Sequence, residues 1–224
     1  MPAKVILNPY AGRWKALRMQ EQLENELKKA GIPFELIQTE MPRHGIELAA
    51  QATIAGYSPI ISAGGDGSIS EVVNGVTRAS LELGMPPPPI GVLPMGTAND
   101  LIVNLKLPLN LPQAVQVIAS GYTRIIDLGK ITAWDLDGKS SQTRYFDNNS
   151  AIGLEPTVTL IQQQIKRLRG TLRYLMATLI AILRNPQWTI HMQWANGEYH
   201  GPNTLVTVGN NPLTGGLFYM APHA

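Results

Sequence analysis

Short apolar runs alternate with amphipathic runs over the first sixty residues of the chain. Residues 4–7, 34–38 and 59–62 are apolar runs of strand length, and residues 13–30 and 46–55 carry apolar side chains at helical spacing. A glycine, Gly31 or Gly56, follows each helical stretch, as is common where a helix ends. This alternation predicts an α/β fold in which helices cover both faces of a parallel sheet. Such sheets bind their ligands at the carboxyl ends of the strands.

The same alternation continues to about residue 120 and then changes. After prolines 86–89, residues 90–93 form another strand-like run, and residues 111–120 form another helical stretch. Strand-like runs then predominate, at residues 125–131, 145–152, 188–194 and 204–208, interrupted by one helical stretch at 156–183. We therefore expect an α/β domain at residues 1–123 and a β-rich second domain at residues 124–224.

Composition excludes several classes of protein. Hydrophobic residues make up 44% of the chain, which is enough for a sizeable core, and the formal net charge of +2 is too small to indicate nucleic-acid binding. There is no cysteine, which excludes disulfides and thiolate chemistry and fits a reducing cytoplasm. No apolar run is long enough for a signal peptide or a transmembrane segment. We expect a soluble protein.

A glycine-rich segment follows the third strand-like run directly. It reads Gly64-Gly65-Asp66-Gly67, and Ser68 with Glu71 fits a capping box at the start of a helix. Glycines leave backbone N–H groups accessible, and a helix N-terminus favours negative charge, so the segment suits a phosphate. Asp66 would repel a bare phosphate and therefore indicates a nearby magnesium ion or hydroxyl. The alternative is a tight strand–helix turn in which Asp66 is solvated.

A second loop of the same kind follows the strand-like run at 90–93. In the segment 96–100, Thr97 and Asn99 carry side chains that suit phosphate or ribose oxygens. The alternative is that Thr97, Asn99 or Asp100 caps the next helix. Because both loops follow parallel strands, we expect them to converge on one hollow that holds the polyphosphate of a nucleotide.

These segments resemble, in order, the signatures of the diacylglycerol kinase catalytic domain family, which includes bacterial lipid kinases and sphingosine and ceramide kinases. The matching segments are Asn8-Pro9 with Gly12, Gly64 to Ser68, Gly96 to Leu101, Ile126 to Gly129, Phe146 to Asn148 with Ile152-Gly153, and Gly215-Gly216 with Ala221-Pro222. The resemblance implies an α/β nucleotide-binding domain like that of phosphofructokinase and NAD kinase, followed by a β-sandwich domain. It also implies transfer of the γ-phosphate of ATP, with magnesium, to a lipid hydroxyl.

The resemblance carries residue roles over to this sequence. The implied nucleotide-binding residues are Asn8, Thr39, Gly64, Gly65, Asp66, Gly67, Ser68, Ile69, Ser70, Glu71, Gly96, Thr97 and Asn99. Asp66, Asp100 and Asp127 match the family's aspartates that are linked through water to magnesium. The family's magnesium carboxylate and general base are expected beyond Ala224, so this chain is expected to hold an incomplete second domain and no metal ligand of its own.

The chain departs from the family pattern at two positions near the implied site. Ser68 stands where threonine is more common, which keeps the hydroxyl. Leu101-Ile102-Val103 replaces an aromatic residue, alanine and often arginine, so no arginine contact to phosphate is expected there. Two other functions stay open, an NAD kinase on the same scaffold and a non-catalytic nucleotide-binding module. The lipid acceptor and the oligomeric state, a homodimer included, are not fixed by the sequence.

Several other residues are open to two interpretations. Residues 174–183 suit either a core helix, which we favour, or a lipid-facing helix of an enzyme that acts peripherally at the membrane. Lys166, Arg167 and Arg169 fit a solvated helix face better than a site for phospholipid headgroups. The four histidines lack metal-ligand spacing, and Trp14 and Trp188 are expected to be core aromatics.

Overall fold

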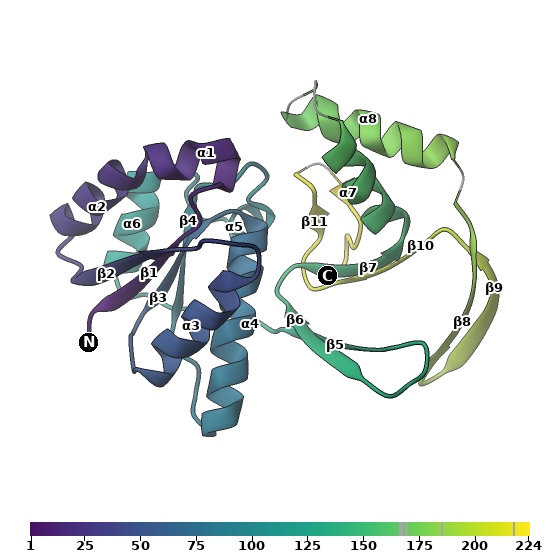
Figure 1. Cartoon of the computed structure of the whole chain (residues 1–224), viewed down its shortest axis with the longest axis horizontal. Coiled ribbons are helices and arrows are strands. Elements are labelled where there is room, and N and C mark those ends of the chain that lie inside the picture. The colour runs from purple at the N-terminus through teal and green to yellow at the C-terminus, as the bar shows by residue number, and fades with distance from the viewer. Residues whose placement is uncertain (166–167, 169, 185, 217) are drawn as a thin grey trace. The chain divides into compact units, whose positions relative to one another are not determined.

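The computed structural model describes residues 1–165, 168, 170–184, 186–216 and 218–224 (Figure 1). The chain divides into two compact units. The first unit comprises Met1–Asn148 together with Asn210–Ala224, and the second comprises Asn149–Gly209. The predicted domain boundary near residue 124 falls inside the first unit, and it stays a prediction.

The first unit begins with alternating strands and helices, as the sequence predicts. The elements are β1 (Ala3–Leu7), α1 (Ala11–Arg18), α2 (Gln20–Lys29), β2 (Phe34–Gln38), α3 (His44–Ile54), β3 (Ile60–Gly64), α4 (Asp66–Leu83), β4 (Ile90–Pro94), α5 (Asp100–Asn104) and α6 (Leu111–Ala119). The four strands form one parallel sheet in the order β2-β1-β3-β4 (Figure 1). The expected α/β fold is confirmed.

Two apolar clusters pack on opposite faces of this sheet. Val5 and Leu7 of β1 belong to a cluster with residues of α1, α2 and α6, whereas Ile6 between them packs with residues of α3 and α4. Successive side chains of a strand point to opposite faces, so a run of apolar residues in β1 serves both clusters. The continuous apolar strands of the sequence are explained by this two-sided burial.

The remainder of the first unit is antiparallel. It contains β5 (Gly129–Trp134), β6 (Ser141–Phe146), β11 (Leu213–Thr214) and β12 (Phe218–Tyr219), in which β5 pairs with β6 and β11 with β12. The strand-like run predicted from residue 125 begins only at Gly129, and Ile125 is exposed. Asn74 of α4 links the two parts, because its amide pairs with both backbone groups of Tyr145 in β6 at 2.8 and 2.9 Å.

The second unit combines antiparallel strands with a helix pair. Its elements are β7 (Asn149–Gly153), α7 (Leu154–Gln164), α8 (Gly170–Leu183), β8 (Trp188–Trp194), β9 (Gly197–Asn203) and β10 (Leu205–Gly209). β7 pairs with β10, and β8 with β9. The predicted single helix over 156–183 is wrong, because Ile165 leaves the helical region with ψ at 97° and two helices result. Lys166, Arg167 and Arg169 lie outside the described residues.

The predicted helix over 13–30 also differs from the structure. Gly12, Arg13 and Trp14 all have positive φ values, between 58° and 68°, so regular helix begins only after them. Trp14 is 48% exposed and lies against Tyr10 in a tilted arrangement, with ring centroids 4.3 Å apart and an interplanar angle of 55°, and Trp188 is 41% exposed. The prediction that both are core aromatics is wrong. The left-handed backbone turns the Trp14 side chain out of the apolar stripe of the helix.

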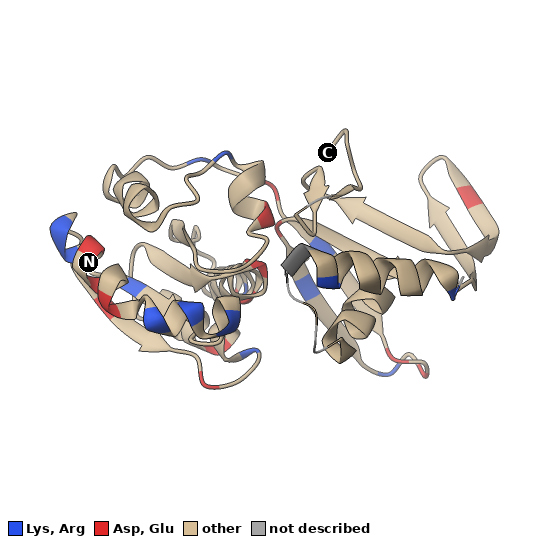
Figure 2. Ribbon diagram, turned by 90° about the horizontal axis from the view of Figure 1, so that it is seen from above, with Lys and Arg blue, Asp and Glu red and all other residues tan. Residues whose placement is uncertain are grey.

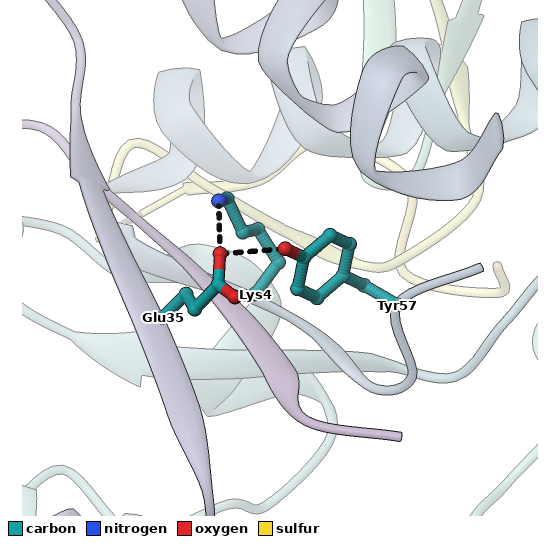
Figure 3. Close-up of polar contacts among 3 residues, drawn as sticks. All are labelled: Lys4, Glu35 and Tyr57. Carbon is teal, nitrogen blue, oxygen red and sulfur yellow. Dashed lines mark hydrogen bonds and ion pairs between the residues drawn. The ribbon is translucent and has the colours of Figure 1, made fainter. Parts of the chain in front are cut away.

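A polar network lies at the amino-terminal ends of β1 and β2, away from the strand ends that carry the glycine-rich loops. The Glu35 carboxylate accepts hydrogen bonds from the Tyr57 hydroxyl at 2.5 Å and the Lys4 ammonium at 3.1 Å (Figure 3). The hydrogen bond from Tyr57 and then that from Lys4 lower the pKa of Glu35. Because these side chains are at the surface, the network contributes little to stability.

Candidate functional site

Three loops meet at the carboxyl ends of β1, β3 and β4. After β1, the Asn8 side chain donates a hydrogen bond to the Ser68 hydroxyl at 2.9 Å, which ties this loop to the start of α4. Gly12 approaches the loop after β4, because a Cβ there would lie 2.9 Å from the Met95 carbonyl oxygen. A side chain at Gly12 would meet that oxygen and would also have to adopt a left-handed φ of 58°.

The two glycine-rich loops touch each other through their backbones. A Cβ on Gly96 would lie 2.4 Å from the Cα of Gly65, and a Cβ on Gly65 would lie 3.0 Å from the Cα of Gly96. No L-residue with a side chain fits at 2.4 Å without a shift of the backbone opposite it. The loops that the sequence places at neighbouring strand ends therefore converge, as we expected.

A hollow of about 560 Å³ opens beside this contact. It is lined by Asn8, Tyr10, Ala11, Gly12, Thr39, Glu40, Met41, Pro42, Gly65, Gly67, Ser68, Glu71, Gly96 and Thr97. Eight of the implied nucleotide-binding residues are in this lining, and they come from the ends of β1, β2, β3 and β4. The volume lies within the range of pockets that hold ligands of nucleotide size.

Other residues that the sequence singled out are not part of this lining. These are Gly64, Asp66, Ile69, Ser70, Asn99, Asp100 and Asp127. Ile69 is fully buried in an apolar cluster with Val73, Leu101 and Ile102, so its side chain supports the site from the core. Gly64 closes β3, where a Cβ would lie 2.3 Å from the Ser68 hydroxyl.

The capping box expected for α4 does not form. Gly65 is the residue that caps α4, without a side-chain hydrogen bond. The Glu71 carboxylate instead accepts hydrogen bonds from the backbone N–H groups of Arg43 at 3.0 Å and Gly45 at 2.9 Å, at the start of α3. A carboxylate is favourable at the positive end of a helix, which explains why Glu71 turns to α3.

Asn99 is the N-cap residue of α5, but its side chain closes its own loop and makes no hydrogen bond to the helix. Its side-chain oxygen accepts a hydrogen bond from the Gly96 N–H at 3.2 Å, while its backbone is left-handed with φ at 55°. Asparagine tolerates this conformation better than most residues. The hydrogen bond fixes the turn that brings Gly96 against Gly65.

The Asp100 carboxylate holds a segment that is distant in sequence. Its two oxygens accept hydrogen bonds from the N–H groups of Gly215 at 2.6 Å and Gly216 at 2.7 Å. One helical turn later, the Asn104 side chain pairs with the N–H and carbonyl groups of Leu213 at 3.3 and 3.1 Å. The short helix α5 thus anchors the segment 213–216 beside the loop after β4.

A second aspartate lies buried near Asp66. Asp147 is only 5% exposed, and burial raises its pKa to about 6, with a hydrogen bond from its own backbone opposing the shift and the charge of Asp66 adding to it. Asp66 accepts a hydrogen bond from the Leu101 N–H at 3.3 Å. Asp127 is exposed, and its carbonyl oxygen accepts a hydrogen bond from the Asn210 side chain.

The sequence did not assign a role to Asp147 or to several residues of the hollow. Tyr10, Glu40, Met41 and Pro42 carry no motif, yet they follow β1 and β2, and the rule that ligands bind at strand ends would have indicated them. Asp147 belongs to the segment 146–148 that matches a family signature, but the burial that raises its pKa depends on the folded chain and could not be predicted. Within the part of the chain that the structure describes, no three carboxylate or imidazole side chains are grouped to hold a metal ion.

Comparison with known proteins gives a family match. The model of the family described as the diacylglycerol kinase catalytic domain matches residues 2–131, which is more than half of the chain. A diacylglycerol kinase of Staphylococcus saprophyticus is 27% identical over 223 residues, covering 99% of this chain and 68% of the relative. A diacylglycerol kinase from Staphylococcus epidermidis is 28% identical, and the match covers 99% of this chain and 66% of that relative. The chain thus spans about two thirds of the length of these relatives.

Solved structures show the same fold. The crystal structure of a diacylglycerol kinase from Bacillus anthracis superposes on this chain with a TM-score of 0.69. The match covers 99% of this chain and 70% of the other, at 21% sequence identity. At that identity the likeness establishes the architecture, and the chemistry has to be argued from the residues of the site.

Proposed function

The chain belongs to the diacylglycerol kinase catalytic domain family of lipid kinases, and on this premise we propose that it transfers the γ-phosphate of ATP to the hydroxyl of diacylglycerol or a related lipid. The observation that carries the proposal is the backbone contact between Gly65 and Gly96, which makes two glycine-rich loops line one hollow. Phosphoryl transfer depends mainly on positioning and charge neutralisation, and converging backbone N–H groups supply both.

The hollow fits a polyphosphate in its chemistry. The first turn of α4 begins there, and the N–H groups of a first helical turn have no carbonyl partner within the helix. Gly67 and Ser68 of this turn line the hollow, and the positive end of the helix dipole adds to their attraction for an anion. The glycines leave room for phosphate oxygens to approach the backbone.

Hydroxyl groups from three loops complete the proposed nucleotide site. Thr39, Ser68 and Thr97 all line the hollow, and Ser68 is oriented by the hydrogen bond from Asn8. A hydroxyl donates to phosphate oxygens and also accepts from ribose hydroxyls. We propose that Gly64, Gly65 and Ile69 to Glu71 shape the loop, while Gly67, Ser68, Gly96 and Thr97 contact the phosphates and Asn99 fixes the second loop.

The resemblance to the family suggests that aspartates of this chain would hold magnesium through water. Asp66 and Asp100 begin α4 and α5, and Asp127 follows in the same unit. Magnesium keeps several waters and neutralises the charge that develops on the transferred phosphoryl group. When magnesium is bound, Asp66 and Asp127 would orient these waters. Asp100 orients the segment that contains Gly215 and Gly216, because its oxygens accept their N–H groups.

Two other functions compete with this proposal. An NAD kinase would share the loop at Gly64 to Gly67, but the family match and the named relatives favour the lipid kinase. A non-catalytic module would bind nucleotide in the same hollow and transfer nothing. We propose that the protein acts in the cytoplasm and reaches its lipid substrate at the membrane surface. An assay that measures nucleotide binding and phosphate transfer separately distinguishes the three functions.

The test combines nucleotide binding with phosphate transfer. The purified protein is titrated with a fluorescent ATP analogue and then incubated with radiolabelled ATP, magnesium and vesicles that contain diacylglycerol. Label in the lipid fraction supports the proposal, label in NAD supports the NAD kinase, and ATP binding without transfer to either supports the module. Thr97→Ala should weaken ATP binding about tenfold, a loss typical of one charge-assisted hydrogen bond. Thr53→Ala, which removes a hydroxyl bound within α3, should leave it unchanged.

A further inference from the structure

Helix α8 presents its large apolar side chains to the outside. Along this helix the exposed residues are Leu172, Leu175, Met176, Leu179, Ile182 and Leu183, each between 36% and 76% exposed. They recur at intervals of three and four residues, so they share one face of the helix. Isolated exposed apolar residues need no explanation, but a contiguous face of six marks a surface that binds something.

The opposite face of α8 buries only small residues. Ala177 and Ala181 are fully buried against Val158 and Ile161 of α7, with Tyr174 and Ile180 packed at the edge. A surface helix in water normally buries its large apolar residues and exposes polar ones. In α8 the large apolar residues are exposed instead. The predicted role as a core helix therefore explains the buried alanines but does not explain the exposed leucines.

Charge indicates what this face contacts. Residues 149–209 contain five basic residues and only two acidic ones, Glu155 and Glu198, a formal charge of +3 against +2 for the whole chain. Arg173 and Arg184 stand near the two ends of α8, where Figure 2 shows blue segments on an otherwise tan helix. The Arg173 side chain donates a hydrogen bond from Nε to the Gln162 carbonyl oxygen of α7 at 2.6 Å, so it is tied to the helix pair. The argument for an anionic partner therefore rests on the net positive charge of residues 149–209, which attracts anionic headgroups while the apolar residues enter the acyl boundary.

We propose that the outward face of α8 docks the protein onto an anionic phospholipid surface, with the helix lying in the plane of the interface. With 14 residues, α8 is about 21 Å long, which is too short to cross a bilayer. No helix among the described residues has the length and apolarity for a membrane span. This inference rests on the proposed lipid substrate, because docking would bring the enzyme to its acceptor.

A second copy of the chain is the competing occupant of this face. Two copies meeting through α8 would bring together two units of the same positive charge, which costs free energy, whereas an anionic surface complements that charge. Dimerisation through α8 is therefore disfavoured by the same observation that favours the membrane.

Vesicle binding tests the proposal without ATP. The protein is floated with vesicles of phosphatidylcholine, with and without 30 mol% phosphatidylglycerol, a fraction on the order of that in anionic membranes. The variant Leu175→Glu/Leu179→Glu places two charges on the face and should reduce partitioning to anionic vesicles at least about tenfold. The control Ile54→Glu/Leu81→Glu introduces the same two charges at exposed apolar residues of α3 and α4. It should alter partitioning to anionic vesicles less than about twofold.

The outcomes separate this inference from the kinase proposal. Equal vesicle binding by wild type and the α8 variant, or no binding by wild type, would overturn the docking surface. Light scattering that shows a dimer dissociated by the α8 substitutions would assign the face to a second copy and would also overturn it. If the protein binds vesicles but transfers no phosphate, the proposed kinase activity is contradicted and the proposed docking surface is supported. Activity on a short-chain lipid in detergent micelles should survive the α8 substitutions, because that substrate needs no vesicle docking.

Discussion

Gly96 and Gly65 show how one missing side chain shapes the site. A methyl group at Gly96 would lie 2.4 Å from the Cα of Gly65 and 2.7 Å from the Asn99 side-chain oxygen. Gly96→Ala should therefore push the two loops apart, weaken ATP binding at least about tenfold and destabilise the fold by about 1–3 kcal/mol, as overpacking does. Thermal unfolding and titration with a fluorescent ATP analogue measure the two effects.

For the stability effect, the matched control is a glycine of the same site at which a side chain would have space. A Cβ on Gly67 would meet no atom within 4 Å, and its φ is not left-handed. Gly67→Ala should leave the unfolding temperature unchanged or raised, since alanine favours a helix. Equal stability and nucleotide affinity for Gly96→Ala and wild type would show that the loop contact does not organise the hollow.

Asp147 makes stability depend on pH in a direction opposite to that of most carboxylates. Because its pKa is raised to about 6, the folded protein holds the proton more tightly than the unfolded chain does. The stabilisation from the protonated Asp147 carboxyl is fully present below the pKa of an aspartate in the unfolded chain, near 4. It is lost as the pH rises through about 6. At neutral pH the ionised carboxylate then costs on the order of 2–3 kcal/mol.

The substitution Asp147→Asn should remove this cost. Urea unfolding from pH 4 to 8 should show the variant gaining stability over wild type as the pH rises, with the difference reaching a plateau above about pH 7. The asparagine keeps the shape of the side chain and the backbone carbonyl that Asn210 and Asn211 bind. A difference that is constant across this pH range would show that Asp147 does not titrate near pH 6.

At the residue scale, the sequence indicated which residues lie near the hollow better than it indicated their partners. Glycine-rich loops at strand ends are predictable, because their geometry is local and depends on a missing Cβ. Glu71 could not be placed, since its partners at Arg43 and Gly45 come from another helix and compete with the local cap. Asp147 lies in a segment that matches the family, but its raised pKa was not predicted because burial is a property of the whole fold.

At the scale of elements, periodicity located the strands and most helices of the parallel sheet. It failed where a backbone break carries no strong sequence signal, as at Ile165 between α7 and α8, and at Arg13 and Trp14, whose positive φ values are unusual for such residues. It also missed β11 and β12, which have two residues each and are defined by their pairing. It missed β9 because that strand contains two glycines and a proline, which are unusual inside strands.

Asn74 joins α4 to β6 and tests how firmly these elements are coupled. Its amide pairs with the N–H and carbonyl groups of Tyr145 and also donates to the Ser70 carbonyl. Asn74→Ala should leave the two groups of Tyr145 without partners and lower the free energy of unfolding by about 2–4 kcal/mol. Arg78→Ala, one turn further along α4, breaks only an exposed ion pair with Glu82 and should cost less than about 1 kcal/mol. Urea denaturation of both variants provides the comparison, and equal losses would refute a specific coupling through Asn74.

At the scale of the molecule, the chain returns to its first unit after residue 209. Asp100 and Gly215 are separated by 115 positions in the sequence, and Asn104 and Leu213 by 109. No local pattern predicts such pairs, because they depend on how the whole chain is routed. The predicted convergence of the glycine loops was easier, since both follow strands of one parallel sheet.

This return predicts that the order of residues 213–216 depends on α5. Asp100→Asn keeps the size of the side chain but offers one acceptor oxygen where the carboxylate offers two, and it removes the charge that strengthens both hydrogen bonds. We expect a loss of about 2 kcal/mol at this contact. Amide exchange at Gly215 and Gly216 should then accelerate by more than tenfold, as such a loss implies (about 1.4 kcal/mol for each factor of ten).

The control for this exchange experiment removes a different side-chain hydrogen bond from the same unit. Asn110 caps α6 by accepting from the Gln113 N–H, so Asn110→Ala should accelerate exchange in the first turn of α6 and leave Gly215 and Gly216 protected. If Asp100→Asn leaves both glycines protected, their order comes from the β11–β12 pairing instead. If both variants accelerate the whole unit equally, the unit unfolds as one body and α5 has no separate hold on the segment. Faster exchange at Gly215 and Gly216 in Asp100→Asn alone would show that α5 holds the segment 213–216 in place. The helix after the second glycine-rich loop would then also position a segment more than a hundred residues away.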